Sequence, residues 1–224
     1  MADRDMRASV HAPDVTSAEY AQHRAAMKRY VGDMLALETH MEERMDGQLR
    51  QSLQHPAVAE AIRRFHNVVK AQRESLRAHL TLLGEGEHPP LEDAVSRLFG
   101  AAAGALEQVR LESVAEVLRD DYVAFNRAAI GYAMLHAAAH ALDHMETMEI
   151  ADRHLRFYAG AVQEINQLVP DVVVWELEKA GMAVNREAIE HCTAAINRAW
   201  RDTAPSEMPA PNQTPEGRTI RRAA

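Results

Sequence analysis

The spacing of apolar residues constrains this chain most, because it repeats at intervals of three and four residues over long stretches. Between residues 20 and 53 the repeat consists of Met27, Val31, Met34, Leu37, Met41, Met45 and Leu49. This period places the side chains on one face of an α-helix, whereas a half-buried strand would show alternation. Strand-like alternation does not occur in the sequence. We therefore predict an all-α fold.

Capping residues, prolines and glycines divide the periodic pattern into separate helices. Thr16 and Glu19 have the spacing of a capping box, which predicts the start of the first helix. Pro56 suits the first turn of a second helix, and Gly84 is expected to end that helix. Further helices are expected at about 91–111, 114–144, 147–169, 171–180 and 185–200. Four long helices with shorter ones favour a four-helix bundle.

The boundaries of the later helices rest on three residues. We expect Pro170 to separate two helices, because proline removes one helical hydrogen bond and clashes with the preceding turn. Gly181 is expected to end the helix that follows, and the side chain of Asn185 is expected to cap the last one.

The two ends of the chain differ in composition from its helical part. We divide the chain into a flexible arm, a bundle, a C-terminal helix and a tail, at residues 1–16, 17–182, 183–202 and 203–224. The tail carries four prolines and is expected to be disordered. It ends in a small basic cluster, Arg218, Arg221 and Arg222. This cluster could dock onto a protein partner.

Charge and composition exclude several classes of protein. The net charge of −8 argues against nucleic-acid binding, including a DNA-protecting role for the arginine tail, because phosphate neutralisation requires a basic surface. Apolar runs are too short to span a bilayer, and the N-terminus lacks the apolar stretch of a secretory signal, so a cytoplasmic location is expected. The single cysteine, Cys192, excludes an internal disulfide and is expected to be buried or half-buried.

The second helix shows the clearest match to a known family. Its matching residues are Pro56, Ile62, Gln72, Leu76, Leu80, Leu83 and Gly84. Met41-Glu42 matches the end of a first-helix motif, and residues 124–132 and 156–159 correspond in position to two more motifs. On this ungapped spacing, residues 30–177 resemble the ferritin-like bacterial stress proteins of the YciF type. The resemblance implies a ferritin-like four-helix bundle with additional short helices, a role in stress and a homodimer.

The resemblance also implies a di-iron site, but most of its ligand positions are changed. Apolar, amide or basic side chains replace the family's His and Glu residues at Phe65, Val68, Phe125, Asn126, Ala128, Arg156, Phe157, Tyr158 and Ala159. Glu42 alone remains, and one carboxylate cannot hold two metal ions. We therefore expect ordinary core at this position, with no metal and no cofactor.

A row of histidines is a second candidate for metal binding. His136, His140 and His144 recur every four residues in the helix predicted at 114–144. Histidines at this spacing can chelate a divalent metal, although the glutamate of the metalloprotease motif is absent. We interpret the three residues as a partly solvated helix face.

Other ionisable residues fall on the long helices without a recognisable motif. Glu38, Glu42 and Glu43 are interpreted as solvated charges on the first helix. His40 and His66 could approach each other near the bundle centre. They are interpreted as buried or boundary residues, and with His154 they would be helpers of any metal site.

Two functions from different classes fit the sequence. The favoured hypothesis is a non-catalytic ferritin-like bundle, acting as a homodimeric binding, scaffold or stress-associated protein. The alternative is a ferritin-like metal-binding protein of the oxidase or ferroxidase type, with a non-standard site that includes Glu42. Sequence signatures of a catalytic nucleophile or a phosphate loop are absent, so enzymatic activity is the less expected outcome.

Overall fold

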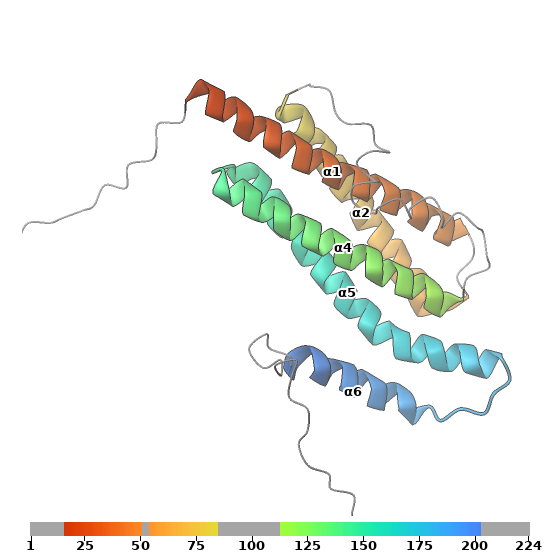
Figure 1. Cartoon of the computed structure of the whole chain (residues 1–224). Coiled ribbons are helices and arrows are strands. Elements are labelled where there is room, and N and C mark those ends of the chain that lie inside the picture. Colours follow the sequence, from red (N-terminus) through yellow and green to blue (C-terminus); the bar gives the residue numbers. More distant parts are fainter. Residues whose placement is uncertain (1–15, 51–53, 85–112, 203–224) are drawn as a thin grey trace, which may run out of the picture. The chain divides into compact units, whose positions relative to one another are not determined.

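The structure is a computed structural model that describes residues 16–50, 54–84 and 113–202 (Figure 1). Its helices are α1 (Ser17–Arg50), α2 (Pro56–Leu82), α4 (Val114–Ala141), α5 (Met145–Lys179) and α6 (Glu187–Asp202). These three ranges contain no strand, so the all-α prediction is confirmed for them. The expected helix at 91–111, most of the N-terminal arm and the proline-rich tail lie outside the described residues.

Contacts divide the chain into two compact units. The first unit ends at Leu168 and the second begins at Val169, so that α5 contributes to both. The first unit contains α1, α2, α4 and most of α5, and the second contains the end of α5 together with α6. The boundary expected between bundle and C-terminal helix, at 182/183, rests on the break near Gly181 and stays a prediction.

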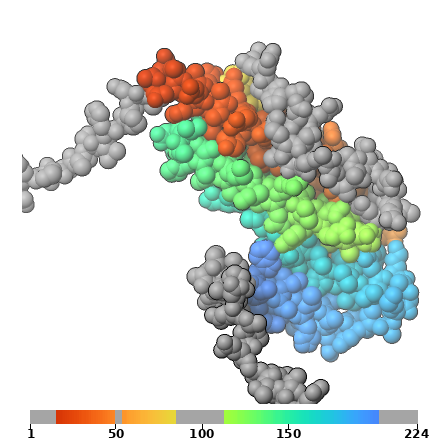
Figure 2. Space-filling model, in the orientation of Figure 1, coloured from red at the N-terminus to blue at the C-terminus, as the bar shows by residue number. Residues whose placement is uncertain are grey.

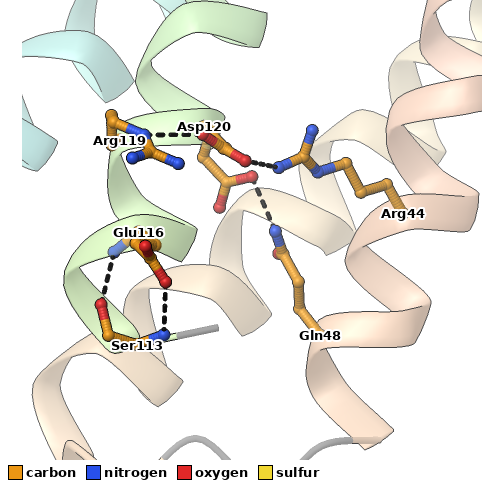
Figure 3. Close-up of polar contacts among 7 residues, drawn as sticks. Arg44, Gln48, Ser113, Glu116, Arg119 and Asp120 are labelled. Carbon is orange, nitrogen blue, oxygen red and sulfur yellow. Dashed lines mark hydrogen bonds and ion pairs between the residues drawn. The ribbon is translucent and has the colours of Figure 1, made fainter. Parts of the chain in front are cut away.

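In the first unit, α1 runs antiparallel to both α2 and α4. Near the start of α1, the Arg24 side chain donates from Nε to the carbonyl oxygen of Leu83, just after α2, at 2.6 Å. Near its end, Arg44 pairs with Asp120 near the start of α4 at 3.0 Å, as Figure 3 shows. The side chains of α1 and α4 also meet on the face drawn in Figure 2.

The helix α5 is antiparallel to the same two helices. Phe65 in the first half of α2 contacts Phe157 of α5, and His79 near the end of α2 contacts Thr147 near the start of α5. Across α4 and α5, Tyr132 stacks on Tyr158. Thus α1 and α5 run in one direction and α2 and α4 in the other. The connection between α2 and α4 therefore joins opposite ends of the unit.

The apolar repeat of α1 faces the core of the first unit. Of its seven residues, Leu49 is half-buried and the other six are buried. Gly131 on α4 permits the close approach of α1, because a Cβ atom there would stand 2.8 Å from Sδ of Met34. The sequence period therefore identified the inward face correctly.

Side-chain caps fix where the helices begin. At α1, the Thr16 backbone N–H donates to Oε2 of Glu19 at 2.8 Å, and the Glu19 N–H donates to Oγ1 of Thr16 at 3.3 Å. The predicted capping box is therefore confirmed. Ser113 and Glu116 form a second one at α4, drawn in Figure 3. At the last helix, Oδ1 of Asn185 accepts the backbone N–H of residue 187 at 3.0 Å, as predicted.

The prediction that Pro170 separates two helices is wrong. Proline 170 lies inside the continuous helix α5. Ile165 and Val172, on either side of it, are both fully buried. Burial of the apolar face on both sides outweighs the local cost of the proline, because tertiary packing overrides helix propensity.

The predicted end of α4 at residue 144 is also wrong, because the helix stops at Ala141. Asp143 has a φ of 53° and ends the helix in a Schellman motif. Its N–H donates to the carbonyl oxygen of His140 at 3.2 Å, and the N–H of His144 donates to that of Ala139 at 2.8 Å. Gly181, with a φ of 80°, makes the same motif at the end of α5. The sequence offers no glycine at 143, so the stop was missed.

These two helix ends generate a reciprocal prediction. Asp143→Gly should stabilise the protein by roughly 0.5–1 kcal/mol, because glycine adopts a positive φ without steric cost. Gly181→Asp should destabilise it by a similar amount for the same reason. Urea unfolding followed by circular dichroism measures both. Equal effects of the same sign in the two variants would contradict this account of the helix ends.

Candidate functional site

Three phenylalanine rings occupy the part of the first unit where the resemblance places metal ligands. Phe65 of α2 lies with its ring centroid 5.3 Å from that of Phe125 on α4, and Phe157 of α5 lies 6.3 Å from Phe65. We call these three residues the ring cluster. Phe65, Phe125, Ala128 and Tyr158 are buried, as expected for ordinary core. The expectation is wrong for Arg156 and Ala159, which are exposed, while Val68, Asn126 and Phe157 are half-buried.

Beside the ring cluster, Glu38 of α1 is completely buried, with 0% exposure. The hydroxyl groups of Tyr132 on α4 and Tyr158 on α5 contact its two carboxyl oxygens, Oε1 and Oε2, the latter at 2.6 Å. The two tyrosine rings stack with centroids 5.7 Å apart. The interpretation of Glu38 as a solvated charge is therefore wrong. Its place in the repeat, between Met34 and Met41, was the signal that could have revealed it.

Burial raises the pKa of Glu38 to about 8, although the hydrogen bonds with Tyr132 and Tyr158 act in the opposite direction. The nearby charge of Glu42 raises this pKa further. Burial also raises the pKa of both tyrosines well above the usual value. At neutral pH the carboxyl group is therefore mainly protonated, and the core holds a neutral hydrogen-bonded triad.

One turn further along α1, Glu42 is also buried rather than solvated, which corrects a second interpretation. Its Oε2 atom lies 2.9 Å from Nη1 of Arg73 on α2. The guanidinium group supplies the opposite charge that a buried carboxylate requires. Glu43, the next residue along α1, is exposed as expected.

Two histidines near this centre are uncharged at neutral pH. His154 of α5 is buried with its ring 5.0 Å from that of Tyr132, and burial lowers its pKa to about 4, with a smaller effect from Arg153. Burial also lowers the pKa of the half-buried His40. The structure pairs His66 with the Asp46 carboxylate at 2.9 Å. That pair joins α1 to α2.

The buried Glu38 makes stability depend on pH in a definite direction. Its pKa is raised from 4.5 to about 8 on folding, so its contribution to stability is full below pH 4.5. That contribution is lost as pH rises through about 8. In Glu38→Gln, the decline between neutral pH and pH 9 should largely disappear. Urea unfolding at a series of pH values measures it.

A matched control for this prediction is Glu43→Gln, on the exposed neighbouring position of α1. This variant should keep the wild-type pH profile. Below pH 6.5, His154 lowers stability as pH falls, because it is neutral when folded and gains a proton on unfolding. In the wild type and in Glu43→Gln the growing contribution of Glu38 offsets this fall down to about pH 4.5, so the acid decline should be steepest in Glu38→Gln. An alkaline decline that persists in Glu38→Gln would show that another group causes it.

A second polar arrangement lies at the end of the first unit where α5 begins. Thr147, which is fully buried, places its hydroxyl 2.7 Å from Nε2 of His79 and 2.8 Å from Nδ1 of His144. Glu146 lies with Oε1 3.7 Å from Nδ1 of His79. We call His79, Thr147 and His144 the histidine relay.

The three-histidine stripe expected on one helix is therefore broken. His136 and His140 remain on α4, with ring centroids 6.5 Å apart, but His144 follows the end of that helix and turns to Thr147. His140 is exposed and His136 is half-buried. Within the described ranges, no group of three or more His, Cys, Asp or Glu side chains is placed to hold a metal ion.

The charge of Glu146, with Oε1 3.7 Å from Nδ1 of His79, favours one set of tautomers in the histidine relay. A proton on Nδ1 of His79 faces that carboxylate, which leaves Nε2 to accept the Thr147 hydroxyl. Thr147 can then accept from Nδ1–H of His144. Burial lowers the pKa of His79, which favours its neutral form. Glu146, His79 and Thr147 follow the order of a catalytic triad, but the buried Thr147 hydroxyl cannot reach a substrate.

A cavity of about 470 Å³ opens next to the histidine relay. The start of α1, the end of α2 and the turn between α4 and α5 form its walls. We call it the end cavity. Among its lining residues are Arg24, Asp143, His144 and Glu146. Sequence reasoning missed this site, because its residues come from three distant segments without a shared motif.

Two further expectations concern the second unit and the membrane. Cys192 on α6 is exposed, so the expected burial is wrong. The apolar residues on its side of α6, Ile189 and Ile196, are only half-buried, so this face of the helix excludes little water. Of the helices that the structure describes, none combines the length and apolar character needed to cross a membrane.

Comparisons with protein-family models, with curated proteins and with solved structures give no match to this chain. Any assignment of function therefore rests on the chain's own residues and geometry.

Proposed function

We propose that this chain is a ferritin-like helical bundle without a di-metal centre and that it acts as a binding or scaffold protein. The observation that carries the proposal is the ring cluster of Phe65, Phe125 and Phe157. Aromatic carbon fills the space toward which three helices would have to direct metal ligands. Carboxylate-bridged metal pairs need Glu and His side chains from all four helices.

The arrangement of helices supports the ferritin-like part of the proposal. Helices α1 and α5 run in one direction, and α2 and α4 run in the other. Side-chain contacts join α1 to α2, α1 to α4, α2 to α5 and α4 to α5, and each of these neighbouring pairs is antiparallel. Such an order needs one long connection, between α2 and α4, and ferritin-like bundles also contain one long crossover. Residues 83–113 separate these two helices in the sequence. Growth-hormone-type bundles, by contrast, need two long connections.

The protonation of Glu38 supports the absence of a metal centre. A carboxyl group must lose its proton to bind a cation, and the pKa of about 8 opposes that loss at neutral pH. Both of its oxygen atoms are already engaged by tyrosine hydroxyls. Glu42 is held by Arg73, whose positive charge would repel a metal ion.

Metal analysis tests the proposal directly. Protein purified without an affinity tag from an iron-supplemented host should contain substoichiometric iron and show no ferroxidase activity. Glu38→Gln should leave the metal content unchanged, because Glu38 is not a ligand in this proposal. Elemental analysis by mass spectrometry measures both proteins.

The same measurement decides the alternative of a non-standard metal site. Glu38, Glu42 and His154 are buried in the central region and would be its first ligands. Two metal ions per wild-type chain, lost in Glu38→Gln, would overturn the metal-free proposal. They would establish a metal-binding bundle of the oxidase type in its place.

A homodimer is part of the proposal, and α4 offers a surface for it. Val123, Ile130 and Met134 are each more than half exposed, and their spacing places them on one stripe of the helix. Light scattering should give a dimer for the wild type and a monomer for Ile130→Lys. Met182→Lys, at an exposed apolar residue of the second unit, should stay dimeric. A wild-type monomer at micromolar concentration would contradict this part.

A stress-associated role, a cytoplasmic location and docking through the C-terminal tail are further parts of the proposal. They rest on the resemblance and on composition. The basic end of the tail, residues 218–222, lies outside the described residues. Pull-down with and without residues 203–224 would test docking, and loss of a specific partner on truncation is the expected result.

A further inference from the structure

The end cavity combines a suitable volume with exposed apolar side chains. Its volume of about 470 Å³ lies in the usual range for small-molecule sites. Tyr20, Leu82 and Met145 line it, and each is at least 60% exposed. Large apolar side chains that converge on one hollow and are rimmed by charges are typical of a binding surface.

The charges around the end cavity are opposite in sign but do not neutralise each other. Arg24 contributes a guanidinium group, and Asp143 and Glu146 contribute carboxylates. In the described part of the chain, no ion pair joins Arg24 to either acid. The Arg24 Nε atom donates to the carbonyl oxygen of Leu83, which fixes the guanidinium group, while its Nη groups make no hydrogen bond to a described residue. Both charges are therefore available to a ligand.

Asp143 is held at the cavity by an unusual backbone conformation. Its φ of 53° is a conformation that glycine adopts more easily, and Gly181 occupies the equivalent place at the end of α5. Backbone strain of this kind often accompanies a functional side chain. The Asp143 carboxylate lines the end cavity, where it can accept hydrogen bonds from a cationic group.

The histidine relay fixes the orientation of the His144 ring at the cavity. Because Nδ1 of His144 is bound to Thr147, its ring cannot turn without breaking that bond. Nε2 of His144 is therefore left for a hydrogen bond to a ligand.

We infer that the end cavity binds a free amino acid with an apolar side chain. The ligand's carboxylate pairs with Arg24, its ammonium group lies at Asp143 and Glu146, and its side chain packs against Leu82 and Met145. A zwitterion satisfies both fixed charges at once, which an acid or an amine alone does not. This assignment rests on the proposed binding role and names a class of ligand for it. It depends on no property of the ring cluster or of the metal content.

The experiment uses the full chain and a set of matched ligands. The common L-amino acids are first screened by thermal shift at millimolar concentration, and binding is then measured by calorimetry. For L-leucine, the matched analogues are isocaproate, which lacks the amino group, and isoamylamine, which lacks the carboxylate. Each analogue should bind at least about tenfold more weakly than leucine, because one charge-assisted contact is lost.

Variants then assign each charge to its residue. Arg24→Gln should remove the advantage of leucine over isoamylamine, because the carboxylate has lost its partner. Asp143→Gly should reduce the advantage of leucine over isocaproate, although this variant should unfold at a higher temperature than the wild type. Weaker binding by a more stable protein cannot come from misfolding. Arg63→Gln, at an exposed position of α2 that does not line the cavity, should bind as the wild type does.

Several outcomes would overturn the assignment. They are the absence of binding by any amino acid in the screen, equal affinity for leucine and both analogues, and wild-type affinity in both Arg24→Gln and Asp143→Gly. Bound iron in the purified protein would overturn the metal-free proposal and leave these measurements unaffected. The two ideas can therefore fail separately.

Discussion

The hydrogen bonds around Glu38 are the constraint on which the packing of the first unit depends. One carboxyl group of α1 contacts Tyr132 of α4 and Tyr158 of α5, so a single buried group sets the relative position of three helices. Apolar contacts alone specify a unique arrangement of helices less strongly than polar contacts do, because cores tolerate varied apolar packing. A shift of one turn would leave the carboxyl group without partners, at a cost of about 1–3 kcal/mol. Register is thus specified by polar groups inside an otherwise apolar core.

The charged groups at the centre and at the end of the first unit are balanced in different ways. At the centre, Glu38 is protonated and Glu42 is paired with Arg73, so these groups are neutral or balanced within the protein. At the end cavity, Arg24 and Asp143 keep separate charges, and no ion pair among the described residues joins them. The first arrangement favours a rigid scaffold and the second favours recognition. This contrast is one reason why we propose a binding role.

The sequence predicted the helices well because the signals for them are local. The capping box of Thr16 and the proline at the start of α2 act within a few residues, and the repeat of α1 identified its buried face. Glu38 was misassigned because residue type suggested the surface, while its position in the repeat indicated the core. The end cavity could not be predicted, since Arg24 and Asp143 lie more than a hundred residues apart in the sequence. Contacts across that separation depend on how the helices pair, which period and capping do not encode.

The helix α5 belongs to both compact units, and Pro170 lies two residues beyond their boundary. A proline has no amide hydrogen, so the helical bond that would span this point is already missing. If α5 unwinds from its C-terminal end, one backbone hydrogen bond fewer has to break near the boundary between the two units. The second unit is free to unravel as a separate cooperative segment while the tyrosines around Glu38 stay in place.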